Sequence, residues 1–134
     1  MTAVVRLVVA CVLQDSRDRI LLARRPEGKS MAGLWEFPGG KVDSNEAPEA
    51  ALIRELDEEL GIAVDAADLR PLTFASHAYK DFHLLMPLYA CRRWTGEAKP
   101  IEHSALAWVR WEELQDYEMP PADEPLIPVL KALL

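Results

Sequence analysis

The segment formed by residues 40–62, GKVDSNEAPEAALIRELDEELGI, constrains the fold of this chain more than any other stretch. Its periodicity predicts a helix that carries Glu55, Glu58 and Glu59 on one face, at positions i, i+3 and i+4. The neighbouring stripe is apolar and consists of Ile53, Leu56 and Leu60. Like charges at this spacing weaken a helix, so the acidic face either is simply solvated or has a partner such as Mg²⁺.

The spacing within this segment favours the second alternative. Gly40 is followed after five residues by Glu46 and, after seven more, by RELDEELGI at residues 54–62. At every specified position this pattern resembles the signature of the Nudix hydrolases, G-x5-E-x7-R-E-U-x-E-E-x-G-U, in which U is aliphatic. A merely solvated acidic helix would not need fixed positions of this kind.

Two further segments extend the resemblance over most of the chain. Residues 34–41, LWEFPGGK, and residues 120–125, PPADEP, are similar to the MutT branch of the family. The resemblance implies an α+β fold, an α/β/α sandwich with a central mixed β-sheet, in a single Nudix domain over residues 1–134. It also implies hydrolysis of nucleoside triphosphates, above all 8-oxo-dGTP, to the monophosphate and pyrophosphate. The implied cofactor is Mg²⁺, with Mn²⁺ able to replace it.

The resemblance places the metal ligands and the catalytic groups on the same side chains. The candidates for both roles are Glu55, Glu58, Glu59 and Glu102. The backbone carbonyl of Gly39 is a further candidate ligand, and Gly40 is expected to make the tight turn into the helix. Glu102 fills the position of a carboxylate that the family takes from a later loop, with Glu97 as the weaker alternative. Metal ions held by such carboxylates can bridge phosphate oxygens and acidify the attacking water.

Candidates for contacts with the nucleotide lie outside the acidic face and are Arg25, Glu36, Phe37, Lys41 and Asp123. Arg25 and Lys41 suit phosphate or base contacts, but each is equally compatible with a solvated charge at a strand edge. Phe37 suits the wall of a base pocket. Asp123 either faces the base or caps the last helix. An ionised Asp123 only accepts hydrogen bonds, which favours guanine, with its donors at N1 and N2, over cytosine.

Two other functions stay open at this point. Relatives that hydrolyse pyrimidine triphosphates such as 5-hydroxy-CTP share much of LWEFPGGK and of the PPADEP segment at residues 120–125. A non-enzymatic, Nudix-like ligand sensor is the third alternative, but such modules usually lose the carboxylates that this chain keeps. The three histidines, His77, His83 and His103, lack any ligand spacing and are expected at ordinary strand or loop positions.

The composition excludes several classes of partner. The chain has 22 Asp and Glu against 15 Lys and Arg, for a formal net charge of −7. This charge argues against nucleic-acid polymers and anionic membranes, so the expected partner is a small nucleoside triphosphate. Cys11 and Cys91 lack metal-like spacing and are typical of free thiols in a reducing compartment. We therefore expect a cytoplasmic monomer.

Turn residues and alternation predict the remaining elements. Strands are expected at residues 4–13, 19–25, 34–37, 71–79, 82–94 and 105–111. The first two strands are expected to form one hairpin, and the fourth and fifth another. A helical turn over residues 111–117 and a closing helix over residues 124–134 follow. The apolar start, residues 1–13, is interrupted by Arg6 and is therefore expected to be a strand and not a signal peptide.

Overall fold

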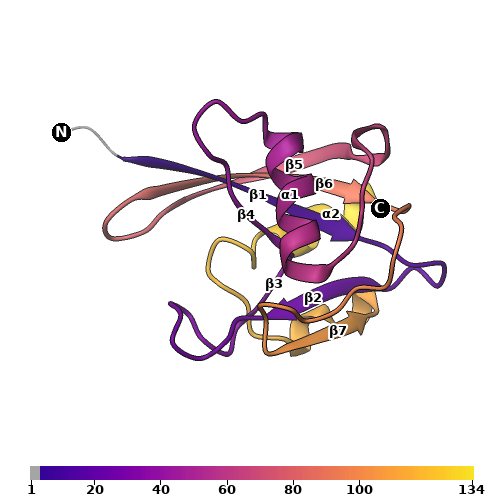
Figure 1. Ribbon diagram of the computed structural model, residues 1–134. Helices are drawn as coiled ribbons and strands as arrows, with labels where there is room; N and C mark the ends of the chain where they lie inside the picture. Colours follow the sequence, from indigo (N-terminus) through magenta and orange to yellow (C-terminus); the bar gives the residue numbers. More distant parts are fainter. Residues whose placement is uncertain (1–3) are drawn as a thin grey trace.

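Strand β1 (Val5–Leu13) is central to the computed structural model, which describes residues 4–134 (Figure 1). It pairs in parallel with β6 (His83–Cys91) and antiparallel with β4 (Gly39–Lys41). Strand β5 (Arg70–Ala78) completes a mixed sheet in the order β4-β1-β6-β5. The strand predicted from residue 4 is confirmed, and the start of the apolar segment, residues 1–3, lies outside the described residues.

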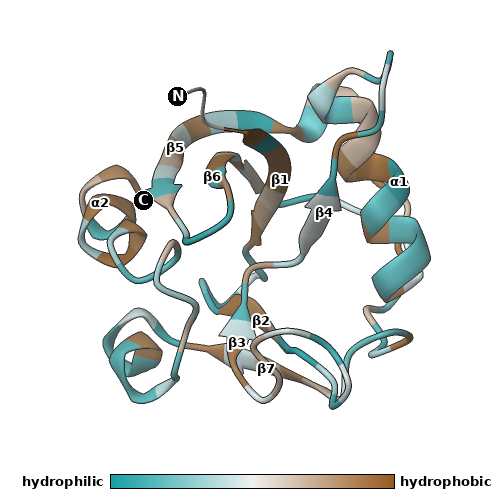
Figure 2. Cartoon of the chain, turned by 90° about the vertical axis from the view of Figure 1, so that its left-hand side faces the viewer, coloured by the Kyte–Doolittle hydropathy of each residue, from teal (hydrophilic) through white to brown (hydrophobic). Residues whose placement is uncertain are grey.

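The two faces of β1 belong to different hydrophobic cores. Successive side chains of a strand point to opposite faces. Cys11 packs in one core with residues of helix α1 (Pro48–Leu60), and Val12 packs in the other with residues of helix α2 (Leu126–Leu133). Figure 2 shows the four-stranded sheet between these helices. This arrangement confirms the α+β fold with a central mixed sheet.

A second, antiparallel sheet lies beside the first. Its strands follow the order β3 (Trp35–Glu36), β2 (Ile20–Arg24) and β7 (Ala105–Val109). The hairpin predicted between the first two strands of the chain is therefore wrong, because β1 and β2 belong to different sheets. Within residues 4–134, the two segments are connected by an isolated antiparallel bridge between Gln14, directly after β1, and Ile20, the first residue of β2.

The turn between β1 and β2 explains the error. Both oxygens of the Asp15 carboxylate accept hydrogen bonds, one from the backbone of Arg17 and Arg19 and the other from Nε of Arg19, at 2.7–3.0 Å. A side chain closes the turn, so the chain reverses without a continuous strand ladder. Strand β1 then takes its partners from residues far along the sequence.

Helix α1 lies within residues 40–62, the segment whose periodicity predicts a helix. Gly61 adopts a left-handed conformation at φ 71°, and its N–H donates to Asp57 O. Ala47 precedes the helix in an extended conformation and provides no side-chain hydrogen bond to it. The helix packs on the core through Leu52, Leu56 and Leu60, all fully buried.

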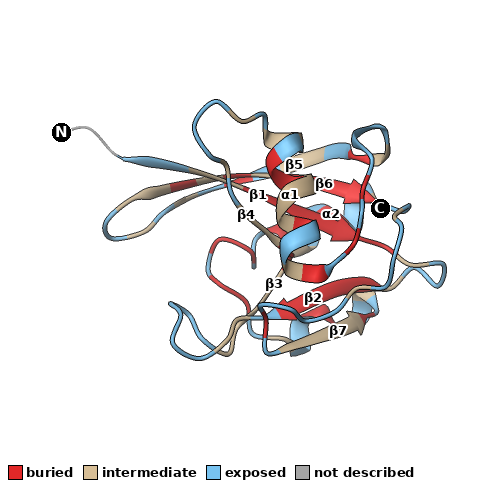
Figure 3. Cartoon of the chain, viewed as in Figure 1, coloured by how far each residue is buried: buried red, intermediate tan, exposed pale blue. Residues whose placement is uncertain are grey.

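The remaining elements agree with the sequence except in detail. The hairpin of β5 and β6 is confirmed, and strand β6 is buried at the end away from the turn (Figure 3). The predicted helical turn is a 3₁₀ helix, η2 (Trp111–Asp116), whereas strand β4 and the short η1 (Ala66–Asp68) were not predicted. Among the described residues, no helix is long and apolar enough to cross a membrane.

Candidate active site

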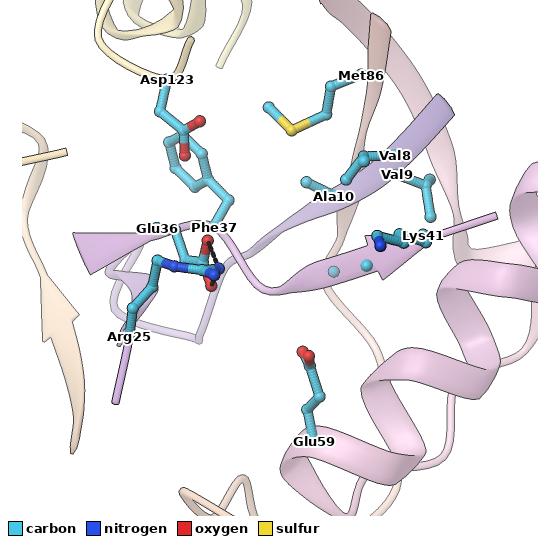
Figure 4. Close-up of a pocket in the computed structure, with 12 residues that line it drawn as sticks. Val8, Val9, Ala10, Arg25, Glu36, Phe37, Lys41, Glu59, Met86 and Asp123 are labelled. Carbon is cyan, nitrogen blue, oxygen red and sulfur yellow. Dashed lines mark hydrogen bonds and ion pairs between the residues drawn. The ribbon is translucent and has the colours of Figure 1, made fainter. Parts of the chain in front are cut away.

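A cavity of about 220 Å³ is lined by residues from both sheets, from α1 and from the segment before α2 (Figure 4). A carboxyl group lies at each of its two ends, one near further carboxylates and the other beside Phe37. Glu59 lies at one end and Asp123 at the other, with Arg25 and Glu36 between them. Lys41 and the buried Phe37 also line it. The cavity therefore brings together all five candidate nucleotide contacts and two candidate metal ligands, Gly39 and Glu59.

The three glutamates of α1 share a face but differ in exposure. The Glu55 side chain is 14% exposed and the Glu58 side chain 51% exposed, and both pair with Nη1 of Arg54 at 2.8 and 3.4 Å. Oε2 of Glu59 is buried and has no hydrogen-bond partner among residues 4–134. Glu59 is thus the carboxylate that faces the cavity without a counter-charge.

The environment of Glu59 makes its charged form costly. Burial raises its pKa to about 9, and the charges of Glu55, Glu36 and Glu102 act in the same direction, whereas a backbone hydrogen bond from Gly39 opposes them. Burial likewise raises the pKa of Glu55, against the hydrogen bond from Arg54. A cation at this end of the cavity would relieve both penalties by replacing the missing positive charge.

Arg54 binds the segment that precedes helix α1. Its Nε and Nη2 donate to the two oxygens of Glu46 at 2.9 and 3.0 Å, and the backbone N–H of Asp43 donates to the same carboxylate at 3.0 Å. Nη2 also donates to Lys41 O at 3.2 Å. Glu46 is therefore used to hold the segment that leads into α1.

The two glycines of β4 are required by close contacts. A Cβ atom on Gly40 would overlap the carboxylate of Glu55, and one on Gly39 would overlap the carbonyl oxygen of Val9. Gly40 lies in a strand and does not make the predicted tight turn into the helix. Its role is instead to let the Glu55 side chain lie directly against the backbone of β4.

The loop after β6 brings Glu102, and not Glu97, to the acidic end. Glu102 lines a hollow of about 120 Å³ together with Glu59, and its charge contributes to the raised pKa values of Glu59 and Glu55. The backbone N–H of Ile101 donates to Glu59 O at 3.1 Å, which holds this loop against the end of α1. Glu97 is exposed and lines neither this hollow nor the cavity.

Three residues in this hollow were not among the sequence candidates, Pro26, Lys29 and His103. His103 is buried, with Nε2 3.1 Å from Oε2 of Glu36. Nη1 of Arg25 donates to both oxygens of the same carboxylate, at 3.1 and 3.2 Å. The only sequence signal for His103 was its position directly after Glu102.

Asp123 lies at the opposite end and is 5% exposed. Burial raises its pKa to about 7 and the charge of Glu36 adds to this, while a backbone hydrogen bond from Phe37 and the charge of Arg25 act against it. No side chain caps helix α2. The backbone N–H of Leu126 donates to the backbone carbonyl of Asp123 at 3.0 Å, and not to its carboxyl group. The carboxyl group is thus available in the cavity.

The donor set at the acidic end suits a hard cation. The candidate side-chain ligands there, Glu55, Glu58, Glu59 and Glu102, are carboxylates, which Mg²⁺ prefers, and a cation would pair with the buried oxygen of Glu59. Between residues 4 and 134, no three acidic, histidine or cysteine side chains already converge on one point. Glu55 and Glu58 pair with Arg54 instead.

Comparisons with known proteins identify similar chains over nearly the full length. A family model of the NUDIX domain matches residues 9–128. A CTP pyrophosphohydrolase of Escherichia coli K12 is 41% identical over 129 residues, which span 94% of this chain and 91% of the relative. An 8-oxo-dGTP diphosphatase of the same organism is 34% identical over 122 residues, 91% of this chain and 93% of the relative. The solution structure of the E. coli ORF135 protein matches with a TM-score of 0.85 and 35% identity, covering 98% of this chain and 91% of that one.

Proposed function

The chain belongs to the Nudix family, and from this premise we propose that it is a Mg²⁺-dependent nucleoside triphosphate pyrophosphohydrolase whose main substrate is 8-oxo-dGTP. The observation that carries this proposal is the polarity of the cavity. Its acidic end lacks a positive charge at Glu59, and its other end presents a buried carboxyl at Asp123. One end suits a metal–polyphosphate group and the other suits a base.

The proposed metal centre uses the acidic end. The residues that would hold Mg²⁺ or Mn²⁺ are Glu55, Glu58, Glu59, Glu102 and the carbonyl of Gly39. When bound, the metal neutralises phosphate charge and lowers the pKa of a coordinated water. The protein itself orients the triphosphate: Lys41 and Arg25 line the cavity between its ends, and Arg54 fixes the direction of the Glu55 carboxylate.

The proposed base preference rests on Asp123 and the backbone around Phe37. An ionised carboxylate accepts two hydrogen bonds, which matches the adjacent N1 and N2 donors of guanine. A buried polar group that loses its partner disfavours the wrong base strongly. The E. coli relative that is named for 8-oxo-dGTP supports this assignment.

A second candidate function is hydrolysis of CTP or of modified pyrimidine triphosphates. Two observations favour it: the 41% identity with a CTP pyrophosphohydrolase, and the pKa of Asp123, which burial raises to about 7. A protonated carboxyl both donates and accepts, and it would match the N3 acceptor and N4 donor of cytosine. The protonation state of this one group therefore separates the two substrates.

The test is a substrate panel with 8-oxo-dGTP, dGTP, CTP and 5-hydroxy-CTP in Mg²⁺ at pH 8, where Asp123 is ionised. We expect kcat/KM for 8-oxo-dGTP to exceed each of the others by ~10-fold or more. Asp123→Ala should remove the preference over CTP and 5-hydroxy-CTP, because dGTP presents the same N1 and N2 donors as 8-oxo-dGTP. Glu124→Ala, a substitution at an exposed neighbour, should retain the whole preference. A higher kcat/KM for CTP or 5-hydroxy-CTP would replace the main proposal by the second, and no hydrolysis of any of the four would refute both.

A further inference from the structure

The segment that carries Glu102 has little regular structure of its own. Residues 96–104 form no helix or strand. Backbone hydrogen bonds tie both ends of the segment: Lys99 N–H donates to Leu60 O at 2.9 Å, and Ser104 N–H donates to Arg24 O at 3.0 Å. The direction of the Glu102 side chain therefore depends on what holds the loop between these ties.

His103 supplies a side-chain anchor next to Glu102. Its side chain is 5% exposed, and Nε2 lies 3.1 Å from Oε2 of Glu36. An ionised carboxylate only accepts hydrogen bonds, so Nε2 carries the hydrogen of this bond. Nδ1 is buried and has no partner within residues 4–134, so the ring makes this single side-chain hydrogen bond.

The partner of His103 is itself fixed. Glu36 lies in β3 and accepts two hydrogen bonds from Arg25 at 3.1 and 3.2 Å. The anchor thus connects the loop to the second sheet, while the bond from Ile101 N–H to Glu59 O connects the same loop to α1. Glu102 lies between these two connections and adjoins the hollow that it shares with Glu59.

We propose that His103 is a positioning residue that holds Glu102 at the acidic end of the cavity and thereby sets the affinity for the divalent cation. This inference rests on the proposed function, because it requires Glu102 to be a ligand. Hydrogen bonds in the shell around metal ligands typically change metal affinity by ~10–100-fold when they are removed. His103 makes its bond to Glu36, one step further from the metal, so an effect near ~10-fold is expected.

The experiment measures Mn²⁺ affinity by electron paramagnetic resonance on the full chain without nucleotide. His103→Phe keeps a ring and removes the donor, and His103→Gln keeps an amide donor near the position of Nε2. His83→Phe is the matched control, because His83 bonds to Ser76 on the β5–β6 hairpin and lines none of the hollows that contain Glu59. We expect His103→Phe to weaken Mn²⁺ binding by ~10-fold, and His103→Gln and His83→Phe to stay close to the wild type.

A double-mutant cycle separates positioning from a general structural effect. If His103 acts through Glu102, His103→Phe should weaken binding little further once Glu102→Gln is present. Thermal unfolding monitors the fold, and His103→Asn, whose amide is too short to reach Glu36, repeats the test with a smaller side chain. Unchanged affinity in His103→Phe and His103→Asn, or additive effects with Glu102→Gln, would overturn the inference. If Glu59→Gln also left Mn²⁺ affinity unchanged, the proposed metal centre would fail with it.

Discussion

Glu58 and Glu59 are neighbours in the sequence but lie in different surroundings. The Glu58 side chain is half exposed and pairs with Arg54, whereas Glu59 turns a buried, unpaired oxygen toward the cavity. Folding either buries the charge of Glu59 or keeps its carboxyl group protonated, and both cost free energy that the solvated Glu58 does not incur. The same substitution should therefore have different effects on stability at the two positions, although both are proposed to serve the metal.

We expect Glu58→Gln and Glu59→Gln each to lower kcat by ~100-fold or more, because a main electrostatic stabiliser is lost. In metal-free buffer, Glu59→Gln should also raise the melting temperature, whereas Glu58→Gln should change it little. Steady-state kinetics and calorimetry measure the two effects, with the exposed Asp57→Asn on the same helix as the control. Undiminished turnover in both variants would contradict the catalytic assignment of this face.

Asp123 provides a second residue-scale prediction, on stability against pH. Burial raises its pKa from the model-compound value of 3.8 to about 7 in the folded chain, so the folded state keeps a proton that the unfolded state has lost between these values. Stability must then fall as pH rises through this window. Asp123→Asn lacks this titration, so its free energy of unfolding relative to the wild type should increase from pH 4 to 7 and then level off. The gain is on the order of a few kcal/mol.

Urea titrations of both proteins at pH 5 and pH 8, in chelator, measure this difference. The comparison isolates Asp123 because the other groups with a raised pKa, such as Glu59, are present in both proteins. A constant difference between the two pH values would show that Asp123 titrates in its ordinary range, and it would remove the second candidate substrate's main physical support.

At the scale of single elements, helix α1 has favourable residues at its first position and at its end, but an unfavourable residue at its N-terminal cap. Pro48 and the left-handed Gly61 suit its first turn and its end. Ala47 has the extended conformation of a cap residue, φ −70° and ψ 147°, but no side-chain acceptor. Packing of the fully buried Leu52 and Leu56 therefore has to hold a helix start that the sequence leaves uncapped.

Ala47→Ser should stabilise the protein by ~1 kcal/mol, because a hydroxyl at this position can accept from the free N–H groups of the first turn. Ala50→Ser, at an exposed position within the helix, is the matched control and should be neutral or slightly destabilising. Urea unfolding measures both changes, and turnover should be unaffected because Ala47 lies outside the cavity. Equal stabilities for the two variants would argue against a missing cap.

At the scale of the whole molecule, the cavity exists because distant segments meet. Glu59 comes from α1, Glu36 from β3, Asp123 from the turn before α2, and Arg25 from the position directly after β2. Through this arrangement the charge of Glu36 adds to the raised pKa of Glu59, whose largest cause is burial. The folded state should therefore bind a divalent cation that the unfolded chain does not bind.

Removal of metal tests this consequence. Excess EDTA should abolish turnover while the fold persists, since the two hydrophobic cores do not include the carboxylates. Adding Mg²⁺ at ~100 times its dissociation constant should stabilise the folded state by ~2.7 kcal/mol, because a ligand of the folded state alone shifts unfolding. Scanning calorimetry with and without Mg²⁺ measures this shift, and Ca²⁺ provides a second divalent cation for comparison. Robust turnover in excess EDTA would refute the metal requirement.

The sequence alone determined the local structure and the identity of the acidic face. The i, i+3, i+4 spacing of Glu55, Glu58 and Glu59 holds in any helix, and Gly61 ends that helix because glycine adopts positive φ without a steric penalty. The hairpin of β5 and β6 was equally local, since a short turn joins two adjacent strands. These features depend on neighbours in the chain, so their patterns are visible in the sequence.

Other features depend on contacts between residues far apart in the sequence, and these features became visible in the folded chain. The tertiary structure separated β1 from β2, because β1 pairs with β4 and β6, and it placed Glu102 rather than Glu97 beside Glu59. It also buried Asp123 and gave His103 its bond to Glu36. Burial and the charges around a group set its pKa, and neither has a period or a spacing in the sequence. The chemistry of the cavity is for this reason a property of the assembled fold.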